Sequence, residues 1–412
     1  MGGAKNHAES LTARGFNDTS EAICTVHIAD DHLLDLVAHD VASGLCAFCD
    51  TPREETVGLE VVVSNVVRAI ERSYDRTEVP SDWVPSLDTS DVLWDEFGDV
   101  FEPETQLFIL GCLNELITVD NWEPLGWERQ DGSTYADWRT FRKLVTHRSR
   151  FIFVANKDRH TPEGAEEASR FVAEFQRIIM ENSEEIIREI PRQTVIYRGR
   201  MVSSLDDAQS LANAAALGPA PDDRAAANRM SPAGISLFYG SATQEAAVAE
   251  IAAHDVEQRD FALVGAFETL RRFRVLDLTN LQVPSVFDES RYARRGDLGF
   301  LKGFVADITS PIKLDGREHR EYAPTQVLTE LIRWSRYPSV DGIALPSAQA
   351  RNLAVDNTAN YVMFFGPESI EGHGSLRDGS RPSFRLPAGS IEAYKVNRRV
   401  DAERAQWRSS TR

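Results

Sequence analysis

The spacing of the apolar residues changes near residue 192, and this change limits the folds that the chain can adopt. Before it, apolar side chains recur at helical spacing over residues 57–74, 104–117, 134–153 and 164–190. After it come short apolar runs typical of strands, at residues 194–202, 235–241, 261–267, 272–279, 340–347, 361–366 and 391–396. Helical patterns at 243–254 and 323–336 lie between these runs. The sequence therefore predicts an α+β protein whose N-terminal domain is α-helical and whose C-terminal domain is mixed.

The length of 412 residues favours more than one domain. Composition and periodicity predict a flexible tail at each end, a short cysteine-containing segment, a helical domain, a linker helix and a mixed α+β domain. The predicted limits, in chain order, are 1–20, 21–55, 56–160, 161–191, 192–400 and 401–412.

The charge balance narrows the classes of partner. The chain has 64 acidic and 45 basic side chains and a net charge of -19, which disfavours non-specific binding to nucleic acid. Its apolar runs are too short to span a membrane, and its polar N-terminal residues lack the apolar core of a secretion signal. We therefore expect a cytoplasmic protein with neither a membrane nor a nucleic acid as its partner.

Three of the four cysteines lie in the segment 21–55. Cys24 and His27 have two residues between them, as do Cys46 and Cys49, and 18 residues separate the two pairs. Thiolate and imidazole pairs at this spacing can bind one tetrahedral Zn²⁺. Four protein ligands would close the coordination sphere and make the ion structural. The alternative is a set of free thiols with a surface histidine.

One pair of basic residues in the helical half resembles a known signature. Arg142 and His147 lie on the third predicted helix with four residues between them, as in HEPN domains, which are helical and often ribonucleolytic. The alternative is a solvated helix end, where basic side chains interact with the helix dipole. We favour a docking, sensing or oligomerising role for this half over cleavage of RNA.

Polar and charged residues lie within or next to the predicted strands of the second half in a distinctive order. Arg198 lies within the first strand, and Arg229 precedes a turn and a strand that ends at Tyr239. Glu250 lies on the next helix, and Ser347 follows a buried strand. Each residue alone has a structural explanation, such as an ion pair, a satisfied core hydroxyl or a turn cap. The planar donors of an arginine within a strand also suit phosphate oxygens.

This order resembles the RES domain family, over about residues 192–400. In that family a strand arginine comes first, and a second arginine precedes a strand that ends in tyrosine. An alanine-rich helix then carries a glutamate, and a late serine precedes an Asn-x-x-x-Phe strand, here beginning at Asn360. The first half resembles the HEPN-like helical domain that precedes RES in longer relatives. The resemblance implies an ADP-ribosyltransferase-like fold for the second half.

The resemblance also implies a reaction on NAD⁺, the cleavage of its nicotinamide–ribose bond. Glu250 would then stabilise the positive charge that develops on the ribose. Arg198 and Arg229 would bind the pyrophosphate, Tyr239 would stack on nicotinamide, and Ser347 would hydrogen-bond the amide or the ribose. The predicted catalytic residues are Glu250, Arg198 and Ser347, and Arg198, Arg229, Tyr239 and Ser347 are predicted to bind NAD⁺.

The acceptor of the ADP-ribosyl group is left open. Water or phosphate would make the protein an NAD⁺-consuming toxin or defence effector, which we favour, and a protein side chain would make it an ADP-ribosyltransferase. A toxin also implies an antitoxin or a regulatory partner. The sequence has no Gly-x-Gly-x-x-Gly run, which argues against a dinucleotide-binding dehydrogenase.

Overall fold

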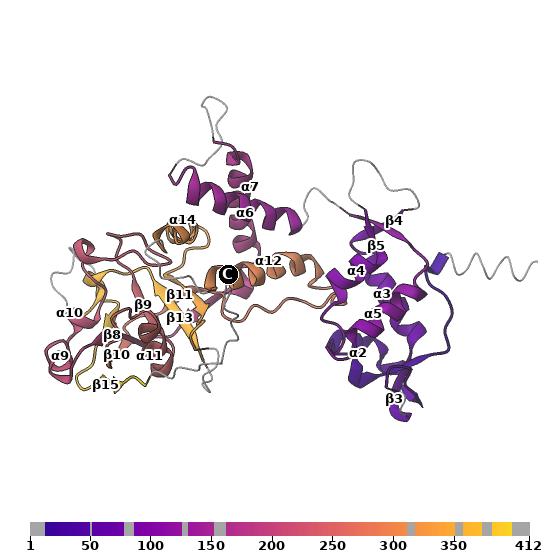
Figure 1. The fold of residues 1–412 in the computed structure, drawn as a ribbon, viewed down its shortest axis with the longest axis horizontal. Coiled ribbons are helices and arrows are strands. Elements are labelled where there is room, and N and C mark those ends of the chain that lie inside the picture. The colour runs from indigo at the N-terminus through magenta and orange to yellow at the C-terminus, as the bar shows by residue number, and fades with distance from the viewer. Residues whose placement is uncertain are drawn as a thin grey trace, which may run out of the picture. The chain divides into compact units, whose positions relative to one another are not determined.

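The structure is a computed structural model that describes residues 13–49, 52–77, 86–125, 131–151, 162–310, 318–350, 357–372 and 381–397. The chain divides into two compact units, which are described separately (Figure 1). The first unit comprises Met1–Thr134 and Gln282–Phe300, and the second comprises Tyr135–Leu281 and Leu301–Arg412. The predicted α+β class is confirmed.

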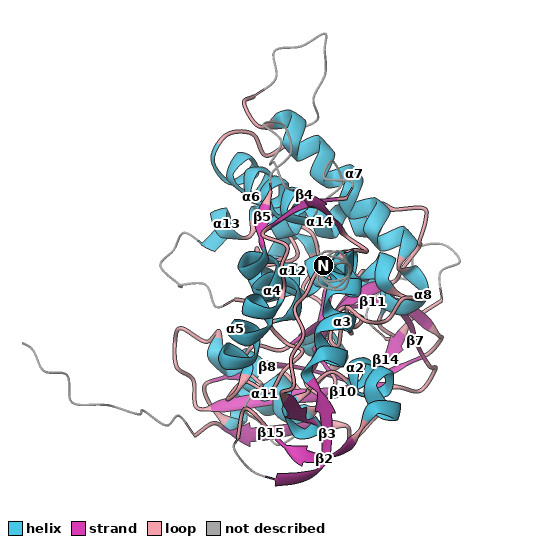
Figure 2. Ribbon diagram, turned by 90° about the vertical axis from the view of Figure 1, so that its right-hand side faces the viewer, coloured by secondary structure: helices cyan, strands magenta, loops and turns pink. Residues whose placement is uncertain are grey.

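The first unit contains strands as well as helices, so the prediction of a purely α-helical N-terminal domain was wrong. Two three-stranded antiparallel sheets, ordered β1-β3-β2 and β4-β6-β5, lie at opposite ends of the helices α3, α4 and α5 (Figures 1 and 2). The elements are β1 (Ala22–Cys24), the 3-10 helix η1 (Thr25–His27), α2 (Asp31–Val37), η2 (Ala38–Asp40), β2 (Ala42–Leu45), β3 (Pro52–Gly58), α3 (Leu59–Ile70), β4 (Tyr74–Thr77), β5 (Leu87–Asp88), α4 (Thr89–Phe97), α5 (Gln106–Leu116) and β6 (Asn121–Pro124). Most of these strands have two to four residues, too few to show an alternating pattern.

The core of the first unit forms around α3, which buries Val62, Val63 and Val66. Phe16 belongs to the same core and is 5% exposed, although the sequence places it in a tail. Residues 1–12 and 401–412 of the predicted tails lie outside the described residues. Val286 and Phe287, which come from far along the chain, complete this core. The first unit is therefore not a continuous stretch of sequence.

The second unit is built on one mixed sheet with strand order β14-β10-β8-β9-β13-β12-β11-β7, and β15 also pairs with β10. The strands predicted in the second half are all present. Among the described strands, β11 and β12 form the one parallel ladder, and Ile370 adds an isolated parallel bridge to Phe384 of β14. The strands are β7 (Ile187–Ile190), β8 (Val195–Val202), β9 (Phe238–Ser241), β10 (Phe261–Thr269), β11 (Phe273–Asp277), β12 (Gly342–Pro346), β13 (Ala359–Met363), β14 (Phe384–Arg385) and β15 (Ile391–Lys395).

One helix of the second unit is shorter than the sequence predicts. The predicted linker helix 161–191 is in fact α7 (Ala165–Glu181), the short α8 (Ser183–Ile186) and strand β7, which pairs with β11. Phe171 of α7 packs on Trp138 with ring centroids 5.4 Å apart, inside the second unit. Helices α6 (Asp131–His147) and α12 (Tyr292–Thr309) each include residues of both units. The other helical segments of the second unit are α9 (Leu205–Ser210), α10 (Ala214–Leu217), η4 (Asp222–Arg224), α11 (Gln244–Ala253), α13 (Glu318–Glu321), α14 (Ala323–Trp334) and η5 (Pro367–Ser369).

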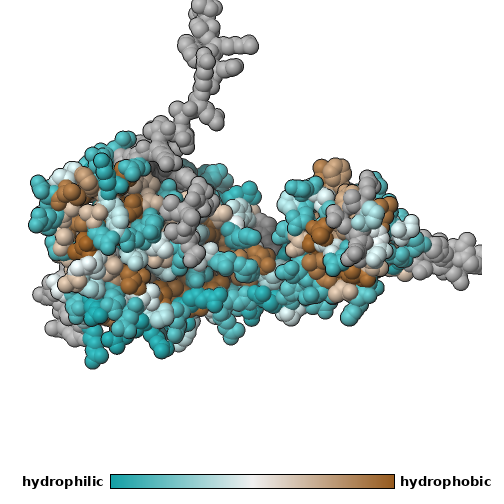
Figure 3. Space-filling view, turned by 90° about the horizontal axis from the view of Figure 1, so that it is seen from below, coloured by the Kyte–Doolittle hydropathy of each residue, from teal (hydrophilic) through white to brown (hydrophobic). Residues whose placement is uncertain are grey.

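Within the described ranges, no helix combines the length and the apolar character needed to cross a bilayer. Hydrophilic residues cover much of the face shown in Figure 3, with apolar residues in scattered patches among them. This mixture is usual for protein surfaces in contact with water.

An aromatic cluster holds the sheet of the second unit together. Phe384 is fully buried and stacks on Phe238 with ring centroids 4.5 Å apart and planes 4° apart. It also stacks on Phe273 at 5.1 Å. Because β14 has only two residues, these ring contacts, rather than its backbone ladder, fix its position.

We expect Phe384→Ala to lower the free energy of unfolding by about 3–5 kcal/mol, because it leaves a cavity among packed rings. Denaturant titration followed by circular dichroism measures this change. Phe151→Ala is the matched control, since Phe151 is 90% exposed. Equal effects of the two substitutions would contradict the proposed packing role.

Candidate active site and metal-binding cluster

Helix α11 places Glu250 over the sheet. The helix begins after Thr243, whose Oγ1 accepts a hydrogen bond from the Ala246 N–H at 3.3 Å. Gly199 of β8 permits close packing, since a Cβ there would lie 2.6 Å from the Leu263 carbonyl oxygen and 3.0 Å from Ile251 Cδ1. Gly199 therefore lies against α11.

Glu250 accepts hydrogen bonds from two distant parts of the chain. Ser347 Oγ donates to its Oε1 at 2.5 Å, and Asn360 Nδ2 donates to the same oxygen at 2.7 Å. The ring of His254, one helical turn later, lies 3.6 Å from Oε2. Burial alone would raise the pKa of Glu250, but these neighbours together hold the pKa below its ordinary value. The carboxylate is therefore ionised at neutral pH.

The partners of Glu250 are themselves held in place. Ser347 is fully buried, and its Oγ also accepts from the Ala350 N–H at 3.1 Å. Asn360 lies opposite Ser241 on the neighbouring strand, and Ser241 Oγ donates to Asn360 Oδ1 at 2.7 Å. That bond turns the Asn360 amide group so that its NH₂ faces Glu250.

Asn360 is not among the predicted site residues, although it belongs to the family pattern. Ser241 and His254 were not singled out either. An asparagine within an otherwise apolar strand and a histidine four residues after a helical glutamate were the available signals. The pairing of Asn360 with Ser241 could not be foreseen, because it depends on strand order.

Tyr239 and Arg229 lie near this network. The Tyr239 hydroxyl hydrogen-bonds Ser231 at 2.9 Å, and burial raises its pKa to about 12. Arg229 donates to the carbonyl oxygens of Ile308 and, at 2.9 Å, Ser310. Burial lowers the pKa of Arg229, while the charge of Glu250 acts in the opposite direction, so the two groups are within electrostatic range.

Arg198 occupies a different environment from Glu250. Its guanidinium donates to the carbonyl oxygens of Leu217 at 2.9 Å, Tyr239 at 2.7 Å and Gly218 at 3.3 Å. Burial lowers its pKa to about 10. Successive strand residues point to opposite faces, so Arg198 projects away from the face on which Gly199 meets α11.

The same alternation assigns the network to one face of the sheet. Tyr197 pairs with Ser241, and Ser241 pairs with Asn360. Residues directly opposite one another in a sheet point the same way. The structure therefore brings Glu250, Ser347 and Asn360 together, with Arg229 and Tyr239 nearby, and separates Arg198 from them by the sheet.

The two residues of the HEPN-like signature do not form a pair. Arg142 makes an ion pair with Asp307 at 3.0 Å and lies 3.6 Å from Glu321. His147 is the exposed last residue of α6. Five residues of helix turn these side chains about 140° apart, so they point in different directions.

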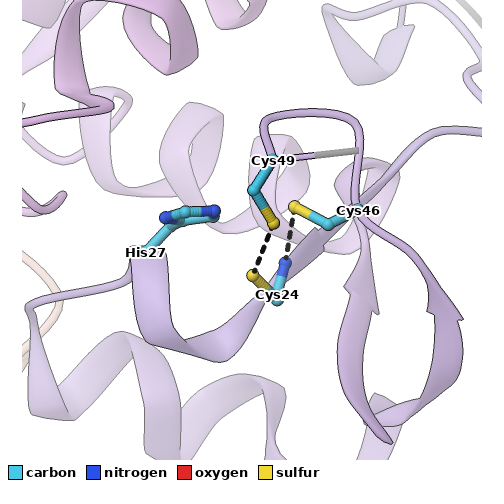
Figure 4. Close-up of side chains that lie close together, drawn as sticks. All are labelled: Cys24, His27, Cys46 and Cys49. Atoms are coloured by element: carbon cyan, nitrogen blue, oxygen red, sulfur yellow. Dashed lines mark hydrogen bonds between the residues drawn. The ribbon is translucent and has the colours of Figure 1, made fainter. Parts of the chain in front are cut away.

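The predicted metal ligands converge in the first unit (Figure 4). One ligand atom from each of Cys24, His27, Cys46 and Cys49 lies within 4.8 Å of the others. Cys24 ends β1, His27 ends η1, and both Cys46 and Cys49 belong to the turn after β2. This cluster could bind a metal ion such as zinc. Cys112, the fourth cysteine, is partly buried on α5 outside the cluster.

Two protein-family models match the chain. Residues 202–374 match the RES domain, and residues 39–159 match HEPN/RES N-terminal domain 1. Neither the curated proteins nor the solved structures give a significant match. The chain therefore contains a RES domain preceded by a HEPN/RES N-terminal domain. The RES match contains Arg229, Tyr239, Glu250 and Ser347, and begins just after Arg198.

The lowered pKa of Glu250 has a consequence for stability. Its contribution is fully present above the ordinary pKa of 4.5 and is lost as the pH falls through the lower folded-state value. We expect the stability difference between the wild type and Glu250→Gln to be constant from neutral pH to about pH 5, and to shrink at lower pH. Denaturant titrations at a series of pH values measure this difference. A difference that grows on acidification would contradict the lowered pKa.

Proposed function

We propose that the protein cleaves the nicotinamide–ribose bond of NAD⁺ and acts as an NAD⁺-consuming toxin or defence effector. The observation that supports this most strongly is the Glu250 carboxylate, kept ionised by Ser347 and Asn360 within the RES domain. A fixed negative charge of this kind suits a reaction whose transition state carries positive charge on a sugar ring.

The two oxygens of Glu250 have different roles in this proposal. Oε1 already accepts two hydrogen bonds, so Oε2 has more capacity to accept a ribose hydroxyl. As the C1′–N bond breaks, nicotinamide leaves with the bonding electrons and becomes neutral. The carboxylate stabilises the resulting oxocarbenium ion until an acceptor oxygen forms the new bond to C1′ and loses its proton.

The two arginines contribute in different ways. Arg229 lies within the electrostatic range of Glu250, so we assign it the pyrophosphate of NAD⁺. Arg198 was expected to share that role, but its bond to the Tyr239 carbonyl supports a positioning role for β9 instead. We assign Tyr239, on the same strand, the role of stacking on the nicotinamide ring.

The acceptor decides the physiological class. Water gives hydrolysis, phosphate gives phosphorolysis, and a protein side chain gives ADP-ribosylation, the alternative that uses the same site. An enzyme that depletes NAD⁺ would arrest its own cell, so we also propose a neutralising partner such as an antitoxin. The ion pairs of Arg142 with acidic residues favour a structural role for that side chain over cleavage of RNA.

We expect Glu250→Gln to lower nicotinamide release by about 100- to 1,000-fold, because it removes the charge that stabilises the transition state. Chromatography of NAD⁺ reactions, with and without phosphate, measures the release and identifies the acceptor. Glu245→Gln is the matched control, since Glu245 is exposed on the first turn of the same helix. Near-normal turnover by Glu250→Gln would refute its assignment, and tagged NAD⁺ incorporated into protein would favour ADP-ribosylation.

We expect Arg229→Ala to weaken NAD⁺ binding by about 10- to 100-fold, as for the loss of a charge-assisted hydrogen bond. Calorimetry in the Glu250→Gln background measures the affinity for NAD⁺ and for nicotinamide riboside, which lacks the pyrophosphate. The riboside should lose little affinity. Arg198→Ala should weaken the binding of both ligands alike. A loss of affinity confined to NAD⁺ would instead support the phosphate-binding role for Arg198.

A further inference from the structure

Apart from the NAD⁺ site, the cluster of Cys24, His27, Cys46 and Cys49 has the dimensions of a metal-ion site. In a tetrahedral site with metal–sulfur bonds of about 2.3 Å, neighbouring sulfurs lie about 3.8 Å apart. The Sγ atoms of Cys24 and Cys49 are 3.8 Å apart, and the four ligand atoms are mutually within 4.8 Å. Figure 4 shows the four side chains pointing toward one another from three elements.

The His27 ring gives an independent indication of a ligand. Its Nε2 is buried and has no hydrogen-bond partner among the described residues. A buried polar atom without a hydrogen-bond partner destabilises the folded protein, and coordination to a metal would offset that cost. The other ring nitrogen, Nδ1, lies 3.4 Å from Thr105 Oγ1. A metal-bound histidine usually makes such a contact through its second nitrogen.

The backbone around Cys46 suits a thiolate. The N–H groups of Cys24 and Phe48 both donate to Cys46 Sγ, each at 3.4 Å. Donors of this kind stabilise negative charge on sulfur and orient the ligand toward the ion. The backbone therefore supports the side-chain geometry, although the cysteine spacing alone could not show this.

We propose that these four residues bind one structural Zn²⁺. Three thiolates and one imidazole are soft and borderline ligands that favour zinc, and four protein ligands leave no open position for catalysis. Binding displaces the thiol protons, and in the folded chain it joins β1, η1 and the turn after β2.

The proposed ion would also stabilise a contact beyond its own ligands. The His27 carbonyl accepts from the Glu102 N–H at 3.0 Å, and the Ala29 N–H donates to the Val100 carbonyl at 2.8 Å. Both bonds connect the segment around η1 to the loop between α4 and α5. Loss of the ion should therefore loosen the core of the first unit as well as the cysteine turn.

The test measures metal in the purified full-length protein after exchange against free Zn²⁺, by mass spectrometry of the elements. The wild type and Cys112→Ser should each hold about one zinc per chain, because Cys112 is the cysteine outside the cluster. Cys24→Ser, Cys49→Ser and His27→Ala should lose most of it. Chelation of the wild type should lower its thermal midpoint.

Replacement of zinc by Co²⁺ in the wild type keeps the proposal testable if a variant fails to fold. A tetrahedral site with three thiolates should give intense visible d–d bands and sulfur-to-cobalt charge-transfer bands. The proposal is overturned by a wild type that holds no metal, by a cobalt spectrum without thiolate bands, or by a Cys24–Cys49 disulfide in peptides from the non-reduced protein.

Discussion

The partly buried carboxylate of Glu250 is the constraint on which the arrangement of the second unit depends. Removing a carboxylate from water is costly unless other groups donate hydrogen bonds to it. Ser347 and Asn360 supply those bonds from 97 and 110 residues further along the chain. Helix α11, the end of β12 and strand β13 must therefore meet at one place. The packing that stabilises the fold also prepares the charge for chemistry.

On the opposite face of the sheet, the charge of Arg198 is also removed from water and also has hydrogen-bond partners within the protein. β8 and β9 share a single residue pair, Tyr197 with Ser241, and the Arg198 guanidinium bonds to the β9 carbonyl of Tyr239 close to that pair. The side chain thus continues the contact between two strands whose backbone ladder is short. The sequence predicts that Arg198 and Glu250 both contact one ligand. In the structure, hydrogen bonds within the protein satisfy most of the capacity of both groups, and Oε2 of Glu250 accepts fewer of these bonds than Oε1.

Local patterns predicted the second half well because its strands are apolar, regular and bounded by turn residues. They failed where tertiary contacts overrode propensity. Residues 187–190 look helical in sequence but form an edge strand, because β11 offers them a backbone partner. Helix α12 has three glycines among residues 296–303, which lower its helical propensity, yet its buried Leu301 and Phe304 hold it in place.

The candidate sites, like the fold, were predicted where the signal is local in the sequence and missed where it depends on tertiary contacts. The spacing of Cys24, His27, Cys46 and Cys49 predicted their cluster, because short loops bring such pairs together. The order of Glu250 and Ser347 predicted their proximity only through resemblance to a family. The role of Asn360 depends on strand order and on Ser241, neither of which is encoded locally.

The discontinuous first unit has a consequence for any shortened version of this protein. Val286 and Phe287 complete the core of that unit, yet they lie inside the segment that matches the RES domain. A fragment that starts at the RES domain would carry these apolar residues without the core that buries them. A fragment that ends before the RES domain would lack Val286 and Phe287 in the core of the first unit. The boundary between the two sequence families therefore differs from the boundary between the two compact units.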